Sequence, residues 1–135
     1  MKQIDILLLE DDPLDVINIK RNLDKLNIHY KLEVAKNGEE GLSILKEKKL
    51  HNNYPEVVLV DINMPRMNGF EFIRSVRKTK ELMHLKCFII TTSNQFIDKE
   101  TASSLGISGY IVKPLKLNNP KSIDSFNLMI DLLNF

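Results

Sequence analysis

The alternation of short apolar runs with amphipathic stretches is the strongest constraint on how this chain can fold. Nearly continuous apolar runs are typical of strands that are covered on both faces, as in a parallel sheet. Four such runs occur: "IDILLL" ending at Leu9, "VVLV" over Val57 to Val60, "CFIITT" from Cys87 and "YIV" from Tyr110. A fifth segment, "KLEV" from Lys31, alternates apolar and polar residues. This alternation predicts an edge strand.

Helical periodicity fills the stretches between these strands. Apolar residues step by three or four positions in two stripes: Val16, Ile19, Leu23 and Leu26, then Ile123, Phe126, Ile130 and Leu133. Helix starts are marked by Asp12 before Pro13, and by two pairs typical of capping boxes, Asn37 with Glu40 and Asn68 with Glu71. Five strand–helix units in strict alternation predict an open, doubly wound α/β sheet with helices on both faces.

Composition limits the class of protein. A chain of 135 residues predicts a single domain, and a net charge of +1 argues against direct nucleic-acid binding. No apolar run approaches the roughly 18 residues that would span a membrane, and no signal region precedes Glu10. The lone cysteine, Cys87, lies in an apolar run and is expected to be buried and inert. These features favour a cytoplasmic protein.

Reactive side chains follow four of the predicted strands. They are Glu10, Asp11 and Asp12 after the first strand, Asp61 after "VVLV", Thr91 and Thr92 after "FII", and Lys113 after "YIV". In doubly wound sheets the working site lies beyond the carboxyl ends of the strands, so these groups are expected to converge. An aspartate can attack a phosphoryl group. Because it is a weak nucleophile facing an anionic donor, it needs the positive charge that Mg2+ and a lysine supply.

The chain resembles the receiver domains of two-component response regulators. The resemblance is carried by "LLLEDD", "VVLVDINMPRMNG", "IITTS" and "GYIVKP", in the order and at the spacing of the family. It implies a flavodoxin-like sheet of five parallel strands in the order 2-1-3-4-5. The "ITTS" segment and the short tail are similar to stand-alone, chemotaxis-like bacterial receivers, and among these to small receivers paired with phytochrome-type kinases.

The resemblance also implies roles for individual residues. Asp61 would be the phosphoacceptor. Glu10 and Asp11 would bind Mg2+, or Mn2+ as a substitute, together with Asp61 and the backbone carbonyl of Asn63. Asp12 is expected to serve mainly as a helix N-cap.

Further roles follow for the fourth and fifth strands. Thr91 would be the switch hydroxyl, the backbone N–H of Thr92 would contact the phosphoryl group, and Tyr110 would be the aromatic switch residue. Lys113 would bind the phosphoryl group, with a cis peptide bond to the following proline. The residues that shape loops would be Pro65, Gly69 and Pro114. The histidines at 29, 51 and 84 show no metal-ligand spacing and are expected at the surface.

The implied function is a signalling switch rather than an enzyme acting on an external metabolite. A sensor histidine kinase would donate the phosphoryl group. Output would pass through the fourth helix, fifth strand and fifth helix, roughly 96–135, to a downstream protein, a further phosphotransfer partner or a homodimer. We expect residues 1–135 to form one receiver domain without an output domain.

Three other classes of protein share parts of this sequence pattern. A phosphatase of the haloacid dehalogenase type needs a second aspartate two residues after the first, where this chain has Asn63. A flavodoxin-like FMN protein needs a phosphate-binding first loop, whereas "EDDPLD" would repel phosphate. A receiver-like interaction module that is not phosphorylated is the third alternative, and the complete set of acid, hydroxyl and lysine counts against it.

Overall fold

The computed structural model describes residues 3–26, 28–64, 66–92 and 99–113. Its strands are β1 (Gln3–Leu9), β2 (His29–Ala35), β3 (Val57–Asp61), β4 (Lys86–Thr92) and β5 (Gly109–Lys113). Its helices are α1 (Pro13–Lys25), α2 (Gly38–Leu50), α3 (Gly69–Lys78) and α4 (Lys99–Ser104). The predicted fifth helix and the residues Pro65 and Pro114 lie outside this description.

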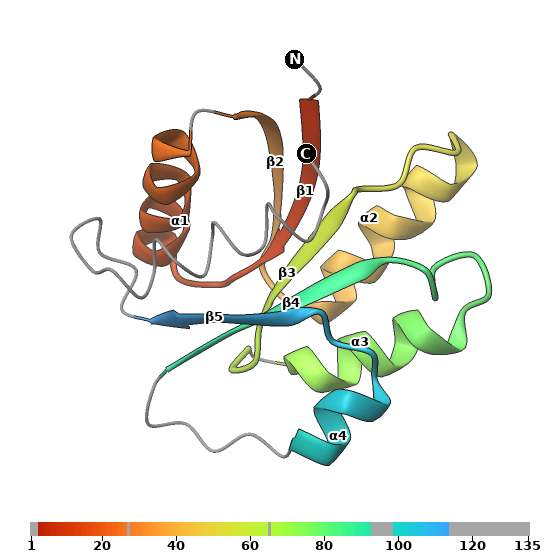
Figure 1. Cartoon of the computed structure of the whole chain (residues 1–135). Helices are drawn as coiled ribbons and strands as arrows, with labels where there is room; N and C mark the ends of the chain where they lie inside the picture. Colours follow the sequence, from red (N-terminus) through yellow and green to blue (C-terminus); the bar gives the residue numbers. More distant parts are fainter. Residues whose placement is uncertain (1–2, 27, 65, 93–98, 114–135) are drawn as a thin grey trace.

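The five strands form one sheet in the order β2-β1-β3-β4-β5, and every neighbouring pair is parallel (Figure 1). This is the predicted order. The segment from Lys31 belongs to β2, which lies at one edge of the sheet, so the prediction of an edge strand is confirmed. Crossover helices connect the parallel strands, as such a sheet requires.

The sheet separates two apolar cores. Along β1, Leu7 and Leu9 belong to the core under α2 and α3, whereas Ile6 and Leu8 belong to the core under α1. Successive side chains of a strand point to opposite faces, so both faces of β1 are buried. The predicted apolar stripe of α1 packs in the same core as Ile6 and Leu8. Phe72 of α3 is fully buried in the core that contains Leu7 and Leu9. None of the helices described here is both long and apolar enough to cross a bilayer.

Polar side chains mark the helix starts as predicted. The Leu14 N–H donates to Asp12 Oδ1 over 2.9 Å, and Pro13 occupies the first helical position of α1. The Glu40 N–H donates to Asn37 Oδ1 over 2.9 Å at the start of α2. Caps of this kind satisfy backbone donors that have no partner within the helix.

A complete capping box begins α3. The Glu71 N–H donates to Asn68 Oδ1 over 3.0 Å, and the Asn68 N–H donates to Glu71 Oε1 over 3.2 Å. This confirms the predicted pair and fixes where α3 begins. The expectation that Gly69 belongs to a loop is wrong, because Gly69 is the first residue of α3.

Gly69 lies against the backbone that carries Asp61. A Cβ atom added at Gly69 would lie 2.7 Å from the Asp61 carbonyl oxygen and 3.0 Å from Ile62 Cα. The Gly69 N–H also donates to the Ile62 carbonyl over 3.1 Å. Close approach between α3 and the end of β3 therefore explains the glycine better than a turn does.

We expect Gly69→Ala to lower the free energy of unfolding by about 1–3 kcal/mol, because the clash is with backbone that cannot move aside. Gly38→Ala is the matched control, since Gly38 also follows an asparagine cap at the first position of a helix. There the nearest atoms to the added Cβ would all belong to the half-buried side chain of Met67: its Cγ and Sδ, both at 2.7 Å, can rotate away, and only its Cβ, at 2.9 Å, is held by the backbone, so we expect a smaller loss. Urea denaturation of both variants measures the difference, and equal losses would contradict the backbone clash.

The remaining sequence predictions about burial are confirmed. Cys87 is fully buried, and this burial raises the pKa of its thiol to about 11. The three histidines are exposed, at His29, His51 and His84. A buried thiol with a raised pKa is a poor nucleophile, so Cys87 contributes to packing.

Candidate functional site

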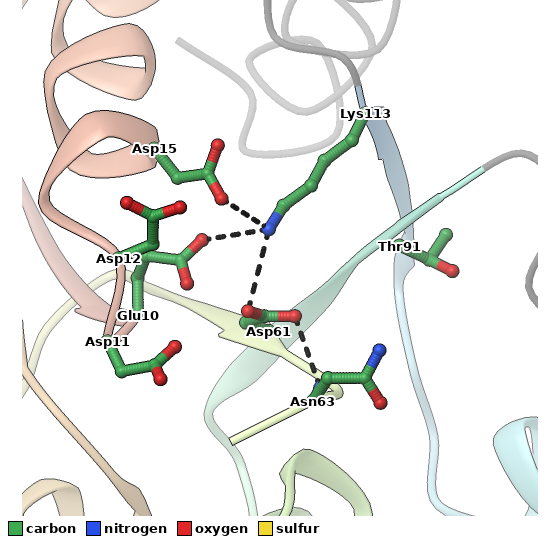
Figure 2. Close-up of a pocket in the computed structure, with 8 residues that line it drawn as sticks. All are labelled: Glu10, Asp11, Asp12, Asp15, Asp61, Asn63, Thr91 and Lys113. Atoms are coloured by element: carbon green, nitrogen blue, oxygen red, sulfur yellow. Dashed lines mark hydrogen bonds and ion pairs between the residues drawn. The ribbon is translucent and has the colours of Figure 1, made fainter. Parts of the chain in front are cut away.

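A cavity of about 290 Å³ opens at the carboxyl ends of the central strands (Figure 2). Six residues expected at the site line it, and so do two carboxylates at the start of α1. The lining residues are Glu10, Asp11, Asp12, Asp15, Asp61, Asn63, Thr91 and Lys113. The predicted convergence of acid, hydroxyl and lysine from separate strands is therefore present in the fold.

The strands run further than the apolar runs suggested. Asp61 is the last residue of β3, Lys113 is the last residue of β5, and β4 includes both Thr91 and Thr92. Their register pairs Asp61 with Ile90, Thr91 with Val112, and Thr92 with Lys113. The expectation that Asp61 and Lys113 follow their strands is thus wrong by one residue each, because backbone pairing continues past the apolar side chains, whereas the predicted run "CFIITT" already included Thr91 and Thr92.

Lys113 is the cation of the site. Its Nζ lies 2.7 Å from Asp15 Oδ2, 3.1 Å from Glu10 Oε1 and 3.5 Å from Asp61 Oδ2 (Figure 2). Burial acts to lower the pKa of Lys113, but the three carboxylates outweigh it, with Asp15 contributing most, and the pKa is raised above its usual value. Lys113 is therefore firmly charged.

Glu10 is buried, with a side chain that has no exposed surface. Burial, followed by the neighbouring Asp61 carboxylate, raises the pKa of Glu10 to about 8, although Lys113 opposes the shift. Among the described residues, neither Glu10 oxygen accepts a hydrogen bond, and Oε1 has only its ion pair with Lys113. Buried oxygens without donors are costly unless a cation or water meets them.

Three carboxylates at the cavity can supply oxygen ligands to a metal ion. One oxygen each from Glu10, Asp11 and Asp61 can be chosen so that all three lie within 4.8 Å of one another. Mg2+ is a hard cation that prefers oxygen ligands and keeps several waters. The donor chemistry and the Oε2 atom of Glu10, which has neither a hydrogen bond nor an ion pair among the described contacts, both fit such an ion.

Asp61 is held at the centre of the cavity. It is 6% exposed, and its Oδ1 accepts a hydrogen bond from the Asn63 N–H over 3.2 Å. Its other oxygen, Oδ2, faces Lys113. Thr91, also 6% exposed, reaches the same cavity from β4. This arrangement presents a carboxylate beside a cation and further acids, in a cavity that Thr91 also lines.

Tyr110 is not among the described residues that line the cavity. Tyr110 is 38% exposed on β5, and Thr92 is the end of β4 next to Lys113 in register. The loop residue Pro65 and the proline after Lys113 fall outside the described ranges.

Asp15 was missed by the sequence reasoning. It lies three residues after the N-cap Asp12, in the first turn of α1, and its carboxylate reaches Lys113. Residues three apart share a helix face, so an acid at this position could have been placed near the same strand end. Asp15 is the last residue of "EDDPLD", which the sequence analysis treats only as an acidic first loop.

Comparison with known proteins identifies close relatives. The response regulator receiver domain family matches residues 6–122. PilH of Pseudomonas aeruginosa is 34% identical over 110 residues, which cover 82% of this chain and 85% of PilH. The transcriptional regulatory protein AfsQ1 of Streptomyces coelicolor is 31% identical over 111 residues, but the chain spans only 45% of it. The structure of the bacteriophytochrome response regulator AtBRR matches with a TM-score of 0.80 at 28% identity, covering 99% of this chain and 94% of that one.

Proposed function

Because the chain belongs to the response regulator receiver domain family, we propose that Asp61 accepts a phosphoryl group from the phosphohistidine of a sensor histidine kinase. The observation that carries this proposal is the position of Asp61, whose carboxylate lies 3.5 Å from the Lys113 amine and forms an acidic cluster with Glu10 and Asp11. A nucleophilic carboxylate needs such positive charge to approach an anionic donor.

The transfer itself is a simple displacement. An oxygen of Asp61 attacks phosphorus, the P–N bond to the histidine breaks, and the leaving imidazole takes a proton from solvent. The hydrogen bond from the Asn63 N–H orients the carboxylate, and Lys113 offsets the negative charge of the incoming group. Bound Mg2+, or Mn2+ in its place, would supply further positive charge from a site made by Glu10, Asp11, Asp61 and the carbonyl of Asn63.

The new group would act as a switch. It adds about two negative charges and three strong acceptors beside Thr91, the Thr92 N–H and Lys113. These residues would close on the phosphoryl oxygens, and Tyr110 on β5 would report the change to the surface. Receiver domains interact with histidine kinases and downstream effectors. Here we propose α4, β5 and the chain beyond Lys113 as the output surface, for a downstream protein, a phosphotransfer partner or a second copy.

The test is intact-mass analysis after incubation with acetyl phosphate. We expect the mass of one added phosphoryl group when Mg2+ is present and none when EDTA removes it, because the acidic rim then repels the donor. Borohydride reduction of the acyl phosphate, followed by peptide mapping, should locate the adduct at Asp61. No adduct, and no uptake of beryllofluoride, would instead favour an interaction module that works without phosphorylation.

A further inference from the structure

Lys113 lies closer to a helix residue than to the proposed acceptor. The Nζ–Oδ2 distance is 2.7 Å to Asp15 but 3.5 Å to Asp61. The Lys113 and Asp15 side chains are only 17% and 22% exposed, so solvent screens this pair less than a surface ion pair. Figure 2 shows the amine between the first turn of α1 and the end of β3.

The contact joins two distant parts of the chain. Asp15 and Lys113 are 98 residues apart and come from the first turn of α1 and the last position of β5. The start of α1 is fixed by the Asp12 cap and Pro13, so the backbone that carries Asp15 has a defined position beside Lys113. Asp15 is thus well placed to determine where the amine rests.

We infer that Asp15 is a positioning residue that holds Lys113 toward α1 in the unphosphorylated protein and opposes its contact with a phosphoryl group on Asp61. This inference rests on the proposed function of Asp61. It assigns Asp15 no part in the transfer itself.

The limited number of donors explains the competition. A lysine ammonium has three N–H donors, and three carboxylates already lie within ion-pair distance of Lys113. A phosphoryl group on Asp61 presents further acceptors, so Lys113 can bind them only by weakening an existing contact. The shortest of these contacts is with Asp15. Removing the Asp15 charge should therefore favour the phosphorylated arrangement.

Asp15→Asn tests the inference, with beryllofluoride in Mg2+ as a stable phosphoryl analogue followed by ¹⁹F NMR titration. We expect the variant to bind beryllofluoride about fivefold more tightly than the wild type, at the low end of typical coupling between sites. Asp15→Glu keeps the charge and should return the affinity toward the wild-type value. An unchanged or weaker affinity in Asp15→Asn would overturn the inference.

Two controls distinguish an effect of Asp15 on the position of Lys113 from the general effect of removing one negative charge near the cavity. Asp12→Asn removes one charge from the same rim but keeps a good N-cap, and Asp12 has no ion pair with Lys113 among the described contacts. It should change affinity much less than Asp15→Asn does. In a Lys113→Met background, Asp15→Asn should lose its effect, and an undiminished effect there would refute positioning through Lys113. If the wild type itself binds no beryllofluoride, the proposed function fails instead.

Discussion

Asp61→Asn is expected to abolish phosphoryl uptake from acetyl phosphate. Asparagine keeps the size of aspartate, but its neutral amide is not a nucleophile toward phosphorus. Asp61 is also a member of the three-carboxylate cluster, so the variant should bind Mg2+ more weakly. Intact-mass analysis with Mg2+ should show no adduct at donor concentrations that fully modify the wild type.

Urea denaturation shows whether Asp61→Asn loses phosphoryl uptake at the site itself or because the protein unfolds. Asp61 lies beside Glu10, and its charge contributes to the raised pKa of Glu10, so removing it relieves repulsion within the cluster. Without Mg2+, Asp61→Asn should therefore unfold at the same urea concentration as the wild type or at a higher one. When Mg2+ is added, the variant should gain less stability than the wild type does. An adduct that persists in this variant would show that another carboxylate is the acceptor.

Lys113→Met should slow phosphoryl uptake about 100-fold, the cost typical of removing one electrostatic contact to a transition state. Methionine fills a similar volume but leaves Glu10, Asp15 and Asp61 without the cation that each contacts. The initial rate of adduct formation at fixed acetyl phosphate and Mg2+ measures the effect.

Lys48→Met is a matched control for Lys113→Met. Lys48 has the same side-chain exposure, 17%, and also forms an ion pair, with Glu33 Oε1 at 3.0 Å, but it does not line the cavity. Its substitution should leave the rate of uptake within about twofold of the wild type, because Lys48 has no contact with the cavity and salt weakens interactions between separated charges. A rate in Lys113→Met equal to that of the control would remove Lys113 from the transfer step.

The sequence allowed the sheet and most of the cavity to be predicted because both depend on local patterns. Apolar runs mark the strands, and in a parallel sheet the residues that end neighbouring strands share one edge. Asp61 and Lys113 could therefore be placed together, although 52 positions separate them in the numbering. The ends of β3 and β5 were less predictable, because the strands extend over Asp61 and Lys113, whose side chains give no apolar signal.

Asp15 and Gly69 show what local patterns do not reveal. The contact from Asp15 to Lys113 depends on how α1 is oriented against the sheet, which packing of the whole core determines. The role of Gly69 depends on how closely α3 approaches the carbonyl of Asp61. In the sequence, a glycine after Met67 and Asn68 is equally compatible with a turn.

The strand register has a practical consequence for handling this protein. Asp61 and Lys113 meet because three strands are aligned residue by residue: Asp61 pairs with Ile90, and Thr92, two positions further along β4, pairs with Lys113, so the two side chains lie on one face of the sheet. A shift of one position would turn either side chain to the opposite face. A preparation with misaligned strands could remain compact and show normal secondary structure, yet it would present no acceptor beside a lysine. The fraction of molecules that gain a phosphoryl group would thus measure the quality of a refolded sample, which circular dichroism alone would not reveal.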